Sequence, residues 1–239
     1  MTNKTKKYIY YNMSNRFSVF NSDPDERSID DVYSDITKKT RTTLIVWKNY
    51  IEQEELQKNK IMLDWQVSLT DSLEYWISLG DNISTGDLIL ARINIGILIE
   101  TWLKIFFTIY SYDYASDESD IIRNYKKKKV GIKKLSLNGL IQFFTSKIDP
   151  VLFYQKCPTQ EDLCRLIGEK ETTDLLQYRE NEIKCYKSFI EWLNRIRNTR
   201  NSVHSFTYRE IGTYHDFIKD TIKFNAFLDI IIQQLPDVN

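Results

Sequence analysis

Apolar residues recur along most of this chain at intervals of three and four positions, the spacing that places side chains on one side of an α-helix. In the segment that begins near Ser28, for example, Ile29, Val32 and Ile36 follow this spacing. The pattern predicts helices over residues 28–58, 60–79, 85–111, 136–147, 160–178, 180–205 and 214–235. The chain contains only 7 Gly and 4 Pro, too few for the many turns of a β-sandwich or barrel. We therefore expect an all-α protein.

Residues with capping chemistry mark several of the predicted helix ends. Ser84 or Thr85, and later Thr213, can accept hydrogen bonds from the N–H groups that a helix start leaves without partners. Gly80 suits the position just after a helix, where a left-handed backbone is common. These signals predict a break between the second and third helices and a defined start for the last one.

The predicted helix at 85–111 is apolar on all sides, which is typical of a helix surrounded by others. Arg92, Glu100 and Lys104 interrupt it and would be costly inside a bilayer, so we predict a buried core helix and no membrane span. Glu100 and Lys104 are four residues apart, in the favourable order for an ion pair. Two interpretations of Glu100 stay open: a simple surface pair, or a buried carboxylate that orients a cation on a neighbouring helix.

Two segments lack the helical pattern. Residues 1–27 include two aromatic runs, at 8–11 and 17–20, which predict either short strands or an arm that packs on the domain. Residues 28–239 are expected to form a single helical domain. Within it, residues 112–135 change from acidic to strongly basic and include Lys126, Lys127, Lys128 and Lys129. This segment predicts a loop that is either solvated or in contact with RNA phosphates.

Charge and cysteine content exclude several kinds of protein and of binding site. Lys and Arg together number 33, as do Asp and Glu, so a wholly basic nucleic-acid binder is excluded, although a local basic patch is not. Cys157, Cys164 and Cys185 fit neither a disulfide framework nor a zinc site, and we interpret them as reduced thiols of a cytoplasmic protein. The sequence has no glycine-rich phosphate loop and no metal-binding pattern, so we expect no cofactor and no metal.

One short stretch, residues 197–204, gathers residue types that suit chemistry on a phosphate. Arg197, Asn201 and His204 have the spacing i, i+4 and i+7, which on a helix places them on one face. Arg binds phosphate through a fork of donors, and His titrates near neutral pH. Together they suffice, without a metal, for attack of an RNA 2′-hydroxyl on the adjacent phosphate. By residue type alone, a histidine beside a helix end is more often structural, as we expect for His215.

Six residues separate Arg197 from His204, and this spacing resembles the Arg-x(4–6)-His motif of the HEPN superfamily. In that family a polar residue commonly follows the arginine, as Asn198 does here. The flanking sequence at 196–213 and the helix around 94–104 are also similar to bacterial HEPN-like proteins. The resemblance covers roughly residues 60–235, and only the motif within it is specific.

The resemblance implies an up-and-down helical bundle of HEPN type. It also implies a homodimer in which the motif helices of two protomers form one composite site. Many HEPN proteins are metal-independent endoribonucleases of toxin–antitoxin or antiphage systems, which leave a 2′,3′-cyclic phosphate. Others are non-catalytic modules that bind a nucleotide or a partner protein, and this alternative stays open.

Within this pattern the site residues take distinct roles. Arg197, Asn198 and His204 are the expected catalytic residues, and RNA is the expected partner, beside an antitoxin or defence-system protein. Asn201 and Glu100 support the site. Arg200 lies too close to His204 for the motif, so it is either a second phosphate contact or a partner for an acid such as Glu100.

Overall fold

The computed structural model describes residues 17–21, 28–53, 60–109, 135–148, 175–201 and 210–235, and every regular element among them is a helix. The elements are α2 (Ser18–Asn21), α3 (Ile29–Gln53), α4 (Lys60–Ser78), the short 3₁₀ helix η2 (Gly80–Asn82), α5 (Thr85–Ile109), α8 (Leu137–Ile148), α11 (Leu175–Arg200) and α12 (Tyr214–Gln234). The predicted all-α class is therefore confirmed. None of the described helices is long and apolar enough to span a bilayer.

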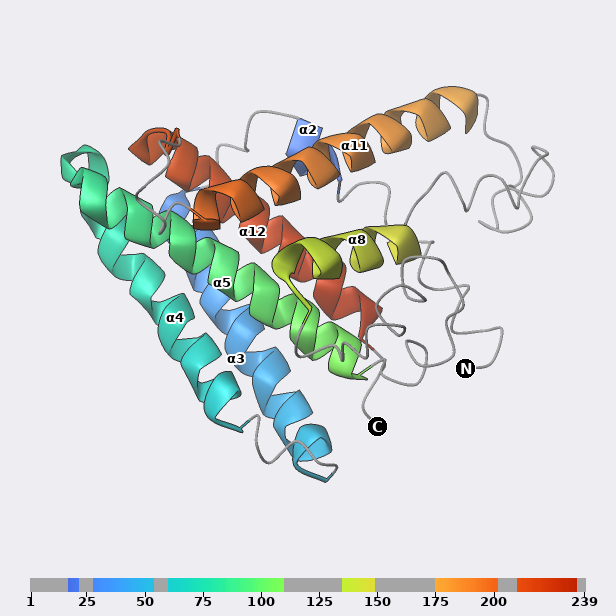
Figure 1. Cartoon of the computed structure of the whole chain (residues 1–239), viewed down its shortest axis with the longest axis horizontal. Coiled ribbons are helices and arrows are strands. Elements are labelled where there is room, and N and C mark those ends of the chain that lie inside the picture. The colour runs from blue at the N-terminus through green and yellow to red at the C-terminus, as the bar shows by residue number, and fades with distance from the viewer. Residues whose placement is uncertain are drawn as a thin grey trace.

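Helices α3, α4 and α5 lie side by side and run alternately up and down (Figure 1). Their directions follow from the pairs that link them. Arg41 and Tyr33 of α3 reach Asp71 and Glu74 of α4, so the contacts move in opposite senses along the two helices. Helix α12 packs on α3 and α5, whereas α11 crosses α5 and lies beside α8 (Figure 1).

Helix α5 is the centre of the bundle, as its apolar sequence predicts, and it contacts α4, α8, α11 and α12. Leu98, Trp102 and Leu103 are fully buried. Two side-chain amides tie α5 to α4, since Asn94 donates to the carbonyl of Leu69 and Gln66 donates to that of Leu98. The helix that carries Glu100 is thus held on several sides.

Residues 17–21 form a helical turn, so the predicted strand at 17–20 is wrong. The alternative expectation of a segment that packs on the helices agrees with what is observed, because Phe17 and Phe20 are buried against Phe189 and Trp192 of α11. Aromatic residues favour a strand only when a partner strand is present, and here a helical surface binds them instead. Residues 1–16, including the run at 8–11, lie outside the described part of the chain.

The predicted caps agree with the structure. Ser84 accepts a hydrogen bond from the backbone N–H of Asp87, and Gly80 has a φ of 57°. Thr213 and Asp216 form a capping box at the start of α12. One boundary is wrong: α11 begins at Leu175, five residues before the expected start, and its α-helical part ends at Arg200. The predicted helix at 160–178 is otherwise outside the described residues.

Gly96 is the point at which α11 comes closest to α5. A Cβ atom on Gly96 would lie 2.8 Å from Cβ of Arg200 and 3.2 Å from its Cγ, closer than carbon atoms normally approach. The absence of a side chain at Gly96 therefore lets the last turn of α11 rest directly on α5. This contact determines how closely the C-terminal end of α11 approaches the central helix α5.

We expect Gly96→Ala to destabilise the protein by about 1–3 kcal/mol, because the added methyl group would push the two helices apart. Gly86→Ala is the matched control on the same helix, since its Cβ would meet only Ser84 Oγ at 3.8 Å. That control should be neutral or stabilising by up to about 1 kcal/mol. Urea denaturation measures the free energy of unfolding of both variants. Equal values for the two variants would contradict the close-packing role of Gly96.

Candidate functional site

The candidate site lies at the C-terminal end of α11, where Arg197 meets the first turn of α8. Nη1 of Arg197 donates to Oδ1 of Asn138, and Nη2 donates to Oδ1 of Asn198 at 3.3 Å. Arg197 and Asn138 are half-buried, and Asn198 is exposed. The structure thus adds Asn138, which the sequence did not indicate, to two residues that it did.

Arg200 points to a different partner. Its Nη2 lies 2.6 Å from Oε2 of Glu100, and Nζ of Lys104 lies 2.6 Å from Oε1 of the same carboxylate. The Glu100 side chain is only 12% exposed, so it is a largely buried carboxylate that holds a cation of a neighbouring helix. The contact that the sequence suggested between Arg200 and Glu100 is therefore present. The expected pair of Glu100 with Lys104 is present too, but on a carboxylate that is largely buried and not at the surface.

Several predicted residues lie outside the described part of the chain. They are His204 and the lysines at 126–129. Asn201 is described and half-buried, one residue beyond the end of α11. Because the α-helix ends at Arg200, the described residues do not extend the expected helical face from Arg197 to His204.

Arg197 differs from the other arginines in the nature of its partners. Each other arginine whose side chain is described forms an ion pair with a carboxylate: Arg41 with Asp71, Arg92 and Arg195 with Asp220, and Arg200 with Glu100. Among the described residues, Arg197 is held only by two neutral amide oxygens. Within the described part of the chain, no carboxylate forms an ion pair with Arg197, a state that favours binding of an anion.

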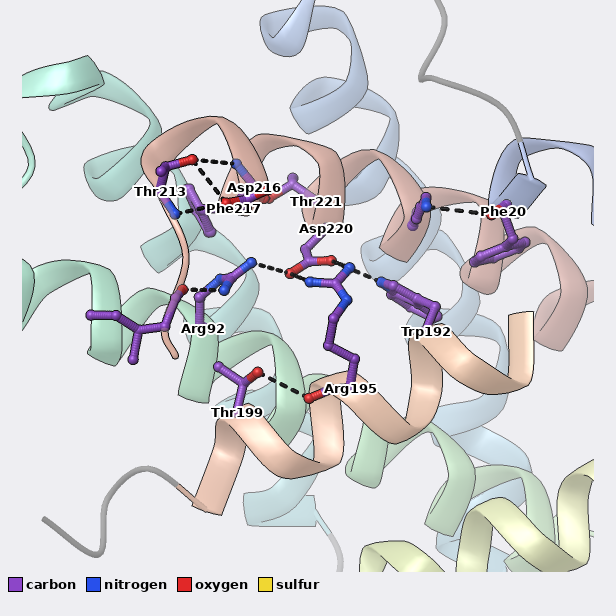
Figure 2. A network of polar contacts seen from close by, with 12 residues as sticks. Phe20, Arg92, Trp192, Arg195, Thr199, Thr213, Asp216, Phe217, Asp220 and Thr221 are labelled. Carbon is purple, nitrogen blue, oxygen red and sulfur yellow. Dashed lines mark hydrogen bonds and ion pairs between the residues drawn. The ribbon is translucent and has the colours of Figure 1, made fainter. Parts of the chain in front are cut away.

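A second polar cluster, the Asp220 network, includes two residues of the same helix, Trp192 and Arg195 of α11 (Figure 2). The carboxylate of Asp220 is fully buried. It accepts hydrogen bonds from Arg92 at 2.7 Å, from Trp192 at 3.0 Å and from both terminal nitrogens of Arg195. Helices α5, α11 and α12 are joined at this one carboxylate, and every partner is a donor.

The Asp220 network also fixes the chain that leads into α12. Arg92 donates to the backbone carbonyl of Ile211, and the next residue, Gly212, has a φ of 69°. A Cβ on Gly212 would lie 2.8 Å from Nη1 of Arg92, so glycine is required there both by conformation and by space. The segment 202–209 is therefore flanked by two residues anchored on α5, Arg200 through Glu100 and Ile211 through Arg92.

The pKa values of Arg92 and Asp216 are shifted by burial and by the hydrogen bonds that these residues form. Burial lowers the pKa of Arg92, although Asp220 acts in the opposite sense. The backbone N–H of Thr213 lowers the pKa of Asp216 through its hydrogen bond, and the Thr213 hydroxyl acts in the same direction. Burial raises the pKa of the Cys185 thiol, which is free; Cys157 and Cys164 lie outside the described residues.

Sequence spacing could have indicated part of this network but not its pairing. Arg92 stands out as a charge within an apolar run, and Asp220 lies on the apolar side of the last helix. Because 128 positions separate them, only the fold brings them together. Among the described residues, no group of three or more His, Cys, Asp or Glu side chains is placed to hold a metal ion.

Comparison with protein-family models, with curated proteins and with solved structures finds no significant match. None of these comparisons indicates a HEPN relationship, and the resemblance rests on the motif at residues 197–204 and its sequence context.

Proposed function

We propose that this protein is a metal-independent endoribonuclease with a HEPN-type site at the end of α11. The observation that carries the proposal is the state of Arg197, the one described arginine whose partners are neutral. A guanidinium held in this way can bind an RNA phosphate through its remaining N–H donors and stabilise the charge that develops on phosphorus.

The remaining roles follow from the chemistry of the motif. His204 takes the proton of the attacking 2′-hydroxyl or gives one to the leaving 5′-oxygen, and a 2′,3′-cyclic phosphate results. Two residues separate Asn201 from His204. The peptide chain therefore keeps their Cα atoms within about 11 Å of each other, which permits His204 to act on a phosphate bound near the end of α11. Asn198 and Asn201 supply neutral donors to the same phosphate.

Arg200 and Glu100 have a supporting role in this proposal. Because Arg200 is paired with Glu100 and packed on Gly96, it fixes the last turn of α11 against the central helix. Glu100 thereby holds Arg200 in an ion pair, which leaves Arg197 as the principal phosphate ligand on this turn.

The wider proposal covers partners and biological setting. Two protomers form a composite site from two copies of the 197–204 segment, and Lys126, Lys127, Lys128 and Lys129 contact the RNA backbone. The protein acts in the cytoplasm as a toxin or antiphage effector that a partner protein restrains. Each of these statements comes from the motif resemblance and the residue types.

The test is cleavage of single-stranded RNA by the purified protein in EDTA, with DNA of the same sequence as the control. We expect RNA fragments with 2′,3′-cyclic phosphate and 5′-hydroxyl ends, and intact DNA, because DNA lacks the attacking hydroxyl. Equal cleavage of RNA and DNA, or loss of cleavage in EDTA, would overturn the proposal. Tight RNA or nucleotide binding without cleavage would support the non-catalytic module instead.

A further inference from the structure

We propose that Asn138 is a positioning residue for Arg197, which holds the guanidinium in place while leaving its charge available to an RNA phosphate. This inference deepens the proposed ribonuclease function and rests on it for the identity of the anion. The contact that carries it joins Nη1 of Arg197 to Oδ1 of Asn138 across 59 positions of sequence.

Asn138 is itself held in a fixed place. It occupies the first turn of α8, between Leu137 and Gly139, which are both buried. Oγ of Ser136 accepts a hydrogen bond from the N–H of Gly139 at 3.3 Å, and the Ser136 carbonyl accepts one from Leu140 at 3.0 Å. Because the start of α8 is capped and partly buried, the Asn138 side chain has little freedom to move. It can therefore restrain the guanidinium of Arg197.

The amide is well suited to position a cation without neutralising it. An arginine has five N–H donors, and Arg197 uses one for Asn138 and one for Asn198. The donors that remain can form the two-point contact that a phosphate prefers. The carboxylate of Asp220 illustrates the opposite arrangement, because it accepts two hydrogen bonds from Arg195 and forms an ion pair with that arginine.

Asn138→Asp is the decisive variant, since it keeps the shape of the side chain and turns the neutral acceptor into a carboxylate. The fold should tolerate it, because an acidic residue in the first turn of a helix interacts favourably with the helix dipole. Asn82→Asp is the matched control, as it adds the same charge at an exposed residue of η2. Asn138→Ala removes the acceptor without adding charge, and thermal melting checks the fold of all three variants.

The probe is a short single-stranded RNA with every ribose 2′-O-methylated, which cannot be cleaved through a 2′-hydroxyl. Its Kd is measured by fluorescence anisotropy across a salt series, and cleavage of the unmodified RNA is measured in parallel. We expect Asn138→Asp to weaken binding about tenfold and to reduce the slope of log K against log salt by about 0.7, the loss of one phosphate contact. Asn138→Ala should bind within about threefold of wild type yet cleave at least about tenfold more slowly, because the arginine keeps its charge but loses its alignment.

The two readouts separate this inference from the proposed function. If wild type binds the probe without cleaving RNA, and Asn138→Asp alone weakens that binding, the positioning role holds and the ribonuclease function fails. If wild type cleaves RNA while Asn138→Asp binds and cleaves like Asn82→Asp, the function stands and the inference is overturned. Failure of wild type to bind the probe would overturn the inference as well.

Discussion

Asp220→Ala is expected to lower the free energy of unfolding by about 3–5 kcal/mol, the cost of leaving a buried charge without its partner. Asp220 is fully buried and joins Arg92, Arg195 and Trp192. Without it, the Arg92 guanidinium, which is 3% exposed, would have no carboxylate among these partners. A loss of this size is a large fraction of the about 5–15 kcal/mol that stabilises a typical domain.

Asp229→Ala is the matched control on the same helix. Asp229 pairs with Lys39, but its side chain is 39% exposed and Lys39 keeps a second partner in Asp35. A surface pair of this kind contributes about 0–1 kcal/mol. Urea unfolding of both variants makes the comparison, and an Asp220→Ala protein as stable as Asp229→Ala would contradict the structural role of the Asp220 network.

Arg197→Ala is expected to slow RNA cleavage by about 100- to 1,000-fold, the typical loss when a donor that stabilises developing charge is removed. The stability of this variant should stay within about 1 kcal/mol of wild type, because Arg197 is half-buried and its partners are neutral amides that water can satisfy. Arg197→Lys should recover only part of the activity, since a lysine keeps the charge but lacks the planar fork. Initial rates of RNA cleavage and thermal melting measure both effects.

Arg41→Ala is the control for the loss of one arginine. Arg41 is 53% exposed, and it pairs with Asp71 between α3 and α4. Its removal should leave cleavage unchanged. If Arg197→Ala cleaves RNA as fast as Arg41→Ala does, then the neutral partners of Arg197 have no connection with catalysis.

The helices were predictable because their signal is local. Apolar spacing, capping residues and the scarcity of glycine and proline are read from neighbouring positions, and they placed α4, α5, α8 and α12 to within a few residues. The predictions were wrong where contacts between distant parts of the chain determine the local structure. Residues 17–20 look strand-like but pack as a turn on α11, and α11 itself begins earlier than its most apolar part indicates.

Contacts between residues of the candidate site were predictable only where the sequence already singled out one of the two residues. The pair of Arg200 and Glu100 followed from two charged residues in predicted helices. By contrast, Asn138 is one amide residue in a short helix, and none of the residues around it in the sequence indicates that it contacts Arg197. Gly96 and Asp220 were missed for the same reason, because close approach and burial are properties of the packed helices.

The most direct test of the proposed ribonuclease is RNA cleavage in EDTA by wild type, His204→Ala and His215→Ala, compared in one assay. His215 is the other histidine of the chain and is exposed at the start of α12, so it controls for the loss of an imidazole. We predict that wild type and His215→Ala cleave at the same rate and that His204→Ala is slower by about 100-fold or more while keeping its fold. Undiminished cleavage by His204→Ala would contradict a HEPN-type site at the end of α11.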